Sequence, residues 1–258
     1  MITFSIITCT YNAADTCERT FTSVLHQTYP YVEHLILDGK SKDDTLAKIE
    51  KYKNLNKEDG KRHTVKCVSE PDKGLYDAMN KGIAKATGDY LLFLNAGDTF
   101  PTENTLMQIV DSLGKDGALP AVLYGDTDIV DMNGNFVRHR RLSPPENLSW
   151  RSFKQGMLVC HQAFYVRTDL AKNTAYDLQY RFSADVDWCI RIMKEAEKMQ
   201  LPLHNVHQVV VNYLEGGLTD KNHRDSLKER FRLMSRHYGL FQTVAMHIWF
   251  IFRSIIKK

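Results

Sequence analysis

The chain has 258 residues, of which 43% are hydrophobic and 25% are charged. This composition is ordinary for a folded α/β protein and supplies enough length for one large domain or two small ones. The formal net charge of +3 is too small to indicate nucleic-acid binding by itself, so we expect no nucleic-acid partner.

The five cysteines are scattered along the chain, and no two of them form a CxxC pair. Most lie in apolar or periodic segments, which predicts buried reduced thiols and a reducing compartment. The N-terminal run Met1–Ile7 has no basic lead and no long apolar stretch, so no signal peptide is expected. These features favour a cytoplasmic protein.

Strand-like and helical runs alternate through the first 98 residues. Strands are predicted at 4–10, 34–37, 64–68 and 90–94, with helices ending near Gln27, running from a cap at Ser41 or Asp43 to Tyr52, and spanning 76–85. Short connections between alternating elements predict a mainly parallel sheet covered on both faces. Ligands bind beyond the carboxyl ends of such strands, so the loops that begin at Thr10, Asp38, Ser69 and Asn95 should converge.

The second half is less regular and predicts a mixed sheet. Strand-like runs occur at 121–124, 162–166 and 206–211, a hairpin turn is predicted at 132–135, and a helix is predicted at 184–199. Beyond residue 216 the sequence becomes helical and basic.

The turn after the first strand lacks the glycines that a dinucleotide fold or a P-loop requires. It offers instead the hydroxyl of Thr10 and the ring of Tyr11, which suit hydrogen bonding and stacking on a nucleobase. Packing within the loop is the alternative for Tyr11. The strand-end carboxylate of Asp38 either accepts an N–H from a base such as uracil or caps the next helix.

Asp98 follows an apolar strand and is the candidate metal ligand, since a divalent cation would bridge it to a diphosphate. Its alternative role is to cap the turn that follows. Asp185 and Asp187 lie at the start of a predicted helix, where capping explains one of them and a general base is a hypothesis for the other. For Trp188 we consider stacking on a sugar and favour packing.

These signals occur in a recognisable order. The chain resembles the family 2 inverting glycosyltransferases of bacterial polysaccharide synthesis, similar to those of the colanic-acid type, over about residues 3–215. The resemblance rests on Thr10-Tyr11-Asn12, Asp38, the run from Ser69 to Gly82, Gly88-Asp89-Tyr90, Asn95-Ala96-Gly97-Asp98 and Ser183-Ala184-Asp185.

The resemblance implies a GT-A fold with a mixed, mostly parallel sheet flanked by helices and a helical C-terminal extension. Residues 1–98 would form the nucleotide-sugar-binding half, 99–215 the acceptor-binding half, and 216–258 a basic amphipathic helical segment. The implied activity is transfer of a sugar from a nucleotide-diphosphate donor, expected to be a UDP-sugar, to a hydroxyl of a glycan or lipid-linked acceptor.

The resemblance also implies roles for individual residues. The nucleotide would contact Thr10, Tyr11, Asp38, Asp72, Lys73, Asn95 and Gly97, and Asp98 would bind Mg²⁺ or Mn²⁺. Asp185 occupies the place of the catalytic base, with Asp187 as the alternative. The acceptor side would include His161, Gln162 and Trp188, and for His161 a loop histidine with satisfied hydrogen bonds is the alternative.

One motif departs from the family pattern. The family commonly has Asp-x-Asp-Asp where this chain has Asn95-Ala96-Gly97-Asp98, so one carboxylate remains. Diphosphate and water supply most ligands of Mg²⁺, so the metal is expected to bind together with the nucleotide. The alternatives are a mechanism in which Lys73 offsets part of the charge, and a non-catalytic nucleotide-binding or scaffold protein of a polysaccharide-assembly complex.

The C-terminal segment 240–258 has apolar residues at helical spacing and basic residues at its end. Its apolar run of about 14 residues is shorter than the roughly 20 that a transmembrane helix needs. An interfacial helix is therefore predicted, supported by upstream Lys228, Arg230, Arg232 and Arg236, which places the protein peripherally on the inner face of the membrane. Packing on the catalytic domain and a homodimer are the alternatives.

Overall fold

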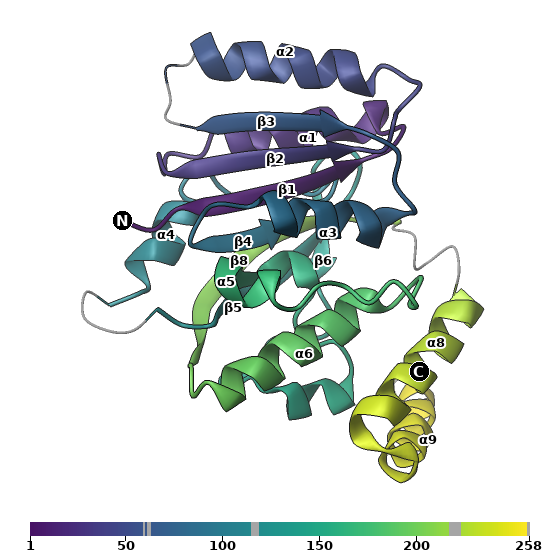
Figure 1. Ribbon diagram of the computed structural model, residues 1–258. Helices are drawn as coiled ribbons and strands as arrows, with labels where there is room; N and C mark the ends of the chain where they lie inside the picture. Colours follow the sequence, from purple (N-terminus) through teal and green to yellow (C-terminus); the bar gives the residue numbers. More distant parts are fainter. Residues whose placement is uncertain (59, 61–62, 115–118, 217–222, 257–258) are drawn as a thin grey trace.

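The computed structural model describes residues 1–258 except 59, 61–62, 115–118, 217–222 and 257–258. Its centre is one eight-stranded sheet in the order β3-β2-β1-β4-β7-β5-β6, with β8 paired to β5 (Figure 1). The strands are β1 (Phe4–Thr10), β2 (Val32–Asp38), β3 (Thr64–Ser69), β4 (Tyr90–Phe93), β5 (Val122–Val130), β6 (Phe136–His139), β7 (Phe164–Arg167) and β8 (Leu203–Leu214).

The first four strands are parallel and lie side by side. Every residue of β1 and β2 is buried, as expected of parallel strands that helices cover on both faces. Thr10 lies opposite Asp38, and Asp38 lies opposite Ser69, so three strand-end side chains meet at one edge of the sheet. The predicted convergence of these strand ends is confirmed.

Helices cover both faces of the parallel strands (Figure 1). On one face, Phe21 and Tyr52 stack with ring centroids 5.0 Å apart in a small core that also includes Ile36. On the other face Gly82 lets its helix approach β1, because a Cβ there would lie 2.5 Å from Ile7 Cγ2. The helices of this half are α1 (Ala14–Leu25), α2 (Thr45–Glu58), α3 (Leu75–Lys85) and α4 (Thr105–Asp111).

The second half of the sheet is mixed, as predicted. β7 is antiparallel to both β4 and β5, whereas β8 is parallel to β5. β5 and β6 form the predicted hairpin, and its turn is held by Asp131, whose backbone N–H donates to Asn135 O at 3.0 Å. The remaining helices are α5 (Thr168–Lys172), α6 (Ala184–Lys198), α8 (His223–Tyr238), α9 (Leu240–Ile256) and the short 3₁₀ helices η1 (Trp150–Gln155) and η2 (His161–Ala163).

The structure differs from the sequence prediction in its short helices. Helices α4, α5 and η1 were not predicted, and the run expected as a strand over 162–166 begins with η2, so that β7 starts only at Phe164. The 3₁₀ turn closes with a hydrogen bond from Ala163 N to Cys160 O at 3.0 Å. In a strand, His161 and Gln162 would point to opposite faces of the sheet. In this turn both side chains reach the site described below, where His161 contacts Asp185 and Gln162 contacts Asp98.

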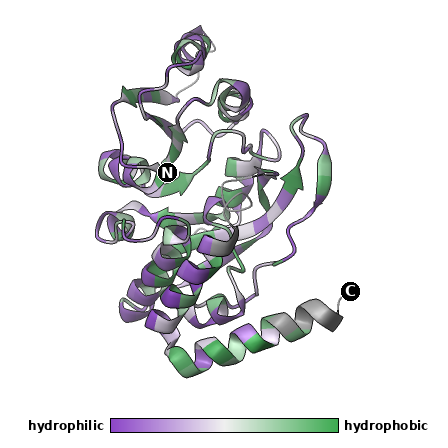
Figure 2. Cartoon of the chain, turned by 90° about the vertical axis from the view of Figure 1, so that its right-hand side faces the viewer, coloured by the Kyte–Doolittle hydropathy of each residue, from purple (hydrophilic) through white to green (hydrophobic). Residues whose placement is uncertain are grey.

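The two C-terminal helices behave differently. Helix α8 is anchored to the body, where Leu233 and Met234 are buried. Helix α9 lies along the base of the molecule, and the coloured part of the helix in Figure 2 carries many apolar residues. Large apolar side chains of α9 are exposed, including Phe241 at 87% and Ile248 at 63%. In the described part of the chain, no helix combines the length and apolarity needed to span a membrane.

Candidate functional site

Asp38 forms the centre of the strand-end cluster. Its carboxylate accepts hydrogen bonds from Thr10 Oγ1 at 3.1 Å, Ser69 Oγ at 2.6 Å, and both Oγ and the backbone N–H of Ser41 at 2.5 and 3.1 Å. Burial opposes ionisation, but the bonds from Ser41, Ser69 and Thr10 outweigh it and hold the pKa of Asp38 below its usual range. The residue is therefore a fixed, ionised acceptor at the edge of the sheet.

Tyr11 and Asp72 lie together beside this cluster. A Cβ at Gly39 would lie 2.4 Å from Asp72 Oδ2 and 3.3 Å from Tyr11 Cδ2, so only glycine leaves both side chains in place. The Tyr11 side chain is 64% exposed, which leaves its ring available for stacking. Lys73 is also exposed, and its backbone N–H donates to Asp77 Oδ2 at 3.0 Å. The structure thus gathers most of the predicted nucleotide residues at one place.

The turn after β4 is rigidly held. Thr20 Oγ1 donates to Asp98 O at 2.8 Å and accepts from Gly97 N at 2.8 Å. Gly97 has φ +108°, a conformation that side-chain-bearing residues rarely adopt. The side-chain Oδ1 of Asn95 is buried and, among the described residues, has no hydrogen-bond partner.

Asp98 is only 3% exposed. Its Oδ1 accepts from Leu214 N at 2.9 Å, and its Oδ2 accepts from Gln162 Nε2 at 3.1 Å. Burial raises the pKa of Asp98 to about 6, although these two hydrogen bonds act in the opposite direction. Asp98 therefore joins the β4 turn to the end of β8 and to η2, and both of its oxygens are engaged. Within the described residues no group of three or more His, Cys, Asp or Glu side chains could hold a metal ion.

Asp185 lies near the start of α6 and faces the β4 turn. Its Oδ2 lies 3.4 Å from His161 Nδ1, while its Oδ1 accepts from Tyr76 OH at 3.3 Å and from Val186 N at 2.9 Å. On the other side of the imidazole, Nε2 lies 3.5 Å from Asn95 Nδ2. His161 thus connects the carboxylate to the turn that contains Asn95.

The environment of Asp185 favours the ionised carboxylate. Burial opposes ionisation, but the hydrogen bond from His161 and the charges of His161 and Arg230 outweigh it and lower the pKa of Asp185. The Asp185 side chain keeps 18% of its surface exposed, so a small group can reach it. Such a carboxylate can accept a proton at neutral pH.

Asp187 lies only two residues further on but faces another direction. It is 2% exposed, with Oδ2 accepting from Arg191 Nε at 2.6 Å and Oδ1 lying 2.7 Å from His237 Nε2 of α8. The structure does not bring Asp187 to His161 or Asn95. Its contacts are those of a carboxylate that attaches α8 to α6.

Trp188 does not reach a ligand in this structure. The side chain is 0% exposed, its indole N–H donates to Thr174 O at 2.6 Å, and its ring stacks on Tyr176 with centroids 4.8 Å apart. The acceptor-side role predicted for Trp188 is therefore wrong, and the packing alternative that we favoured describes its position. Gln162 is likewise buried, and its side-chain amide donates a hydrogen bond to Asp98.

Three contributors to the site were missed as functional residues. The sequence pattern predicts only a helix cap for Ser41 and a membrane-facing position for Arg230. It predicts no role for Tyr76, which lies within the Ser69–Gly82 run. Arg230 instead acts electrostatically on Asp185, and its Nε is buried without a hydrogen-bond partner in the described part of the chain. Sequence spacing does not predict that Arg230 lies near Asp185, because the two residues are brought together only when α8 packs on the body.

The family model for glycosyl transferase family 2 matches residues 5–173 of the chain. An uncharacterized glycosyltransferase of Mycobacterium tuberculosis (strain CDC 1551 / Oshkosh) is 35% identical over 193 residues, covering 73% of this chain and 68% of the relative. A PGL/p-HBAD biosynthesis glycosyltransferase of Mycobacterium bovis (strain BCG / Pasteur 1173P2) is 34% identical over 220 residues, covering 84% and 79%. The amylovoran biosynthesis glycosyltransferase AmsB of Erwinia amylovora is 28% identical, covering 81% and 70%.

Solved structures share the fold at low sequence identity. S. aureus TarS 1-349 in complex with UDP-GlcNAc superimposes with a TM-score of 0.68 at 17% identity, covering 90% of this chain and 65% of the TarS 1-349 chain. Glucosyl-3-phosphoglycerate synthase from Mycobacterium tuberculosis, in complex with Mn²⁺, UDP and glucosyl-3-phosphoglycerate, gives a TM-score of 0.57 at 16% identity and covers 91% and 80%. The expected GT-A fold is confirmed. Together with the family match, these similarities establish that the chain belongs to glycosyl transferase family 2 and is a glycosyltransferase.

Proposed function

We propose that the chain transfers a sugar, with inversion, from a UDP-sugar to a hydroxyl of a glycan or lipid-linked acceptor in cell-surface polysaccharide or glycolipid synthesis. The observation that carries this proposal is the ionised Asp185, held by His161 beside the turn after β4. The names of the curated relatives and the UDP ligands of the structural neighbours support the donor and the pathway class.

One part of the site suits binding of the nucleotide, and another part lies where the sugar would be. Asp38, with its ordered hydroxyl neighbours, and the exposed ring of Tyr11 suit recognition of a base by hydrogen bonding and stacking. Asp72 and Lys73, which follow β3, suit the ribose or diphosphate. The sugar would then lie toward Asn95, on the side of Asp185.

In the reaction, the acceptor oxygen attacks the anomeric carbon from the face opposite the nucleotide. A new C–O bond forms as the bond to the diphosphate oxygen breaks, the nucleotide diphosphate leaves, and the hydroxyl proton passes to Asp185. The lowered pKa of Asp185 keeps its carboxylate ionised and ready for this transfer. His161 orients the carboxylate, and the charge of Arg230 favours its ionised form.

A divalent cation fits the oxygen donors of the β4 turn in part. Asn95 Oδ1 is a buried acceptor without a partner among the described residues, whereas Asp98 presents an oxygen only when Gln162 turns away. Both are the hard ligands that Mg²⁺ and Mn²⁺ prefer, and we propose Asp98 as the protein carboxylate on the ion. Bound there, the cation would offset the charge of the departing diphosphate.

The decisive variant is Asp185→Asn, assayed by UDP affinity in calorimetry and by UDP release from UDP-glucose and UDP-GlcNAc. Proton transfer contributes about 10²–10⁴-fold to such rates, so turnover should fall by about that factor while UDP affinity stays unchanged. Asp169→Asn is the matched control, since Asp169 is also a carboxylate in the first turn of a helix but is paired with Arg167 on the surface. Turnover close to that of the wild type in Asp185→Asn would refute the base assignment.

A non-catalytic nucleotide-binding or scaffold protein is the second candidate, favoured by the engagement of both Asp98 oxygens. A thermal-shift panel of UDP, GDP, dTDP and CMP, with and without Mn²⁺, separates the transferase from a scaffold that binds no nucleotide, and the UDP-release assay separates it from a non-catalytic nucleotide-binding protein. Binding of a ligand to the folded state raises Tm, so metal-dependent stabilisation by UDP supports the transferase with a UDP donor. Stabilisation by none of the nucleotides supports the scaffold.

Peripheral contact with the inner face of a membrane is proposed for residues 240–258. The support is the exposed apolar surface of α9, which no other described element covers at Leu240, Phe241, Ile248 and Trp249. A homodimer that buries the same surface is the competing proposal.

A further inference from the structure

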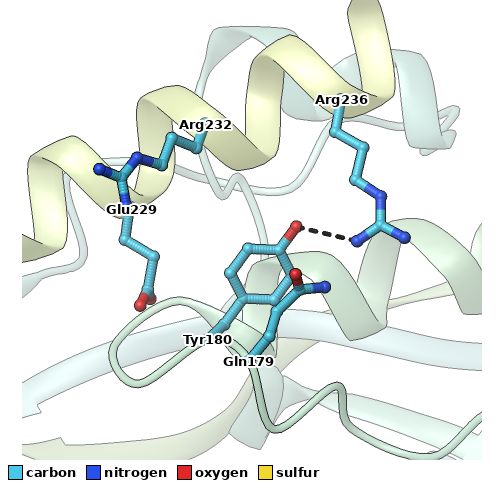
Figure 3. A pocket seen from close by; sticks show the side chains of 5 residues that line it. All are labelled: Gln179, Tyr180, Glu229, Arg232 and Arg236. Atoms are coloured by element: carbon cyan, nitrogen blue, oxygen red, sulfur yellow. Dashed lines mark hydrogen bonds between the residues drawn. The ribbon is translucent and has the colours of Figure 1, made fainter.

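A cavity of about 420 Å³ lies between helix α8 and the loop that precedes α6 (Figure 3). Tyr180 and Gln179 come from the loop, and Glu229, Arg232 and Arg236 come from the helix. The cavity is separate from the strand-end cluster around Asp38. Its volume falls within the range of about 300–1,000 Å³ that is usual for ligand-binding pockets.

The carboxylates at this cavity are already engaged. Glu229 accepts three backbone N–H groups, those of Arg181 and Phe182 at 2.7 Å and that of Ser183 at 2.6 Å. Asp177, beside the cavity, accepts from Gln179 and lies 3.5 Å from Arg236 Nη1. Glu229 therefore holds the loop in place next to the cavity, and Asp177 offsets part of the charge of Arg236.

The arginines retain donors for a ligand. In the described part of the chain, Arg232 has no hydrogen-bond acceptor or ion-pair partner, and its side chain is exposed. Arg236 donates to Tyr180 OH at 3.3 Å, so the Tyr180 hydroxyl remains available as a donor (Figure 3). Two guanidinium groups and a phenol at one cavity suit the oxygens of a phosphate or diphosphate.

The cavity lies on the acceptor side of the site. The loop that lines it continues through Ser183, whose N–H is held by Glu229, directly to Asp185 two residues later. The nucleotide residues lie instead at the ends of β1, β2 and β3. A phosphate bound at the cavity would therefore lie beside the loop that leads into the proposed base, and apart from the strand ends that carry the proposed nucleotide residues.

An apolar surface begins directly beyond the cavity. Only residues 237–239 separate Arg236 from Leu240, where the exposed apolar side of α9 starts. Figure 2 shows the coloured part of this helix along the base of the molecule, with apolar residues on it. A ligand with a phosphate joined to a hydrocarbon chain would match the arginines with its head and α9 with its tail.

We propose that Arg232, Arg236 and Tyr180 form a subsite for the phosphate or diphosphate of a lipid-linked acceptor, with α9 contacting the lipid. This inference rests on the proposed transfer to such an acceptor. It goes further in giving the acceptor an anionic linkage and in naming the residues that bind it.

The test is calorimetric binding of farnesyl diphosphate, with inorganic diphosphate and farnesol as partial ligands. Farnesyl diphosphate should bind more tightly than either part. Arg232→Ala should weaken its binding roughly 10- to 100-fold, the range for loss of a hydrogen bond to a charged group. Lys228→Ala is the matched control, an exposed cation of the same helix that pairs with Asp225 and does not line the cavity, and it should bind within about twofold of wild type.

Arg232→Ala is the primary variant because the described structure gives its side chain no partner to lose, so the fold should be unaffected. The double variant Arg232→Ala with Arg236→Ala should abolish binding of the diphosphate head and leave UDP affinity unchanged. Equal loss in Lys228→Ala, wild-type binding in Arg232→Ala, or no binding of farnesyl diphosphate to the wild-type protein would each overturn the proposal.

Two further measurements separate the sources of the phosphate and the two proposals. Sedimentation with phosphatidylcholine vesicles, with and without phosphatidylglycerol, tests a bulk lipid headgroup. Arginine-dependent binding to phosphatidylglycerol that farnesyl diphosphate does not displace would overturn the acceptor subsite. Asp185→Asn should bind farnesyl diphosphate as the wild type does. If the wild-type protein binds farnesyl diphosphate but transfers no sugar, the proposed function is rejected and the acceptor subsite is not.

Discussion

Replacing Asp187 with Asn tests whether this carboxylate is structural, as its contacts indicate, or catalytic. Asp187 is 2% exposed and stands at the centre of a polar chain in which Lys194 contacts His237, and both His237 and Arg191 contact the carboxylate. Asparagine keeps the shape but removes the charge. It also places an N–H₂ group opposite either Arg191 or His237, where a carboxylate oxygen now accepts a hydrogen bond.

The expected cost follows from these contacts. Removing one partner of a buried ion pair destabilises a protein by about 3–5 kcal/mol. The Arg191 side chain is 29% exposed and recovers part of its solvation, so we expect the lower end, about 3 kcal/mol. For a chain of this size 1 kcal/mol corresponds to about 2–4 °C, which gives a decrease in Tm of about 6–12 °C.

The pH dependence provides a second readout. Burial opposes ionisation of Asp187, but His237 and Arg191 outweigh it and lower its pKa in the folded state. A lowered folded-state pKa contributes stability above the unfolded value, near 3.9, and loses it as pH falls through the folded value. The difference in stability between wild type and variant should therefore be full at neutral pH and shrink in acid.

The assay is thermal unfolding by circular dichroism together with UDP release per folded molecule. We expect a large decrease in Tm and nearly unchanged turnover at a temperature where the variant is folded. A Tm within about 2 °C of wild type, combined with a loss of turnover of about 10²-fold or more, would show that Asp187 acts in catalysis and refute this reasoning.

Three further predictions concern the β4 turn and α9. Burial raises the pKa of Asp98 to about 6, so its folded-state protonation stabilises the protein at low pH and this contribution is lost as pH rises through that value. Asp98→Asn should therefore flatten the fall in Tm between about pH 4 and pH 6, and an unchanged slope would contradict the assignment. Gly97→Ala should lower Tm by about 2–12 °C, because φ at this position is +108° and strain of this kind costs about 1–3 kcal/mol; an unchanged melt would show that the turn relaxes. Deleting residues 240–258 should abolish sedimentation with phosphatidylglycerol vesicles, since it removes the exposed apolar surface of α9, and retained binding would exclude that helix as the membrane contact.

The parallel half of the fold was predictable because its signals are local. An apolar run such as Tyr90–Phe93 has to be buried on both sides, and short connections leave few arrangements for consecutive strands and helices. Since all these strands run the same way, the sequence alone predicts Thr10, Asp38 and Ser69 at one edge of the sheet. Helix α4 was missed because its seven residues are too few to display a clear period.

The sequence by itself determined the class of sheet, the strand-end residues and, through the order of its motifs, the family. The tertiary structure decided which face of α6 meets the site. Side chains two residues apart on a helix are rotated by about 200° around its axis and point to nearly opposite sides, so Asp185 and Asp187 cannot both face His161. Which of them does depends on η2 and α8, distant in sequence, and the same holds for Asp98, whose two partners come from Leu214 and Gln162. Contacts between such separated segments arise from packing, which no local pattern encodes.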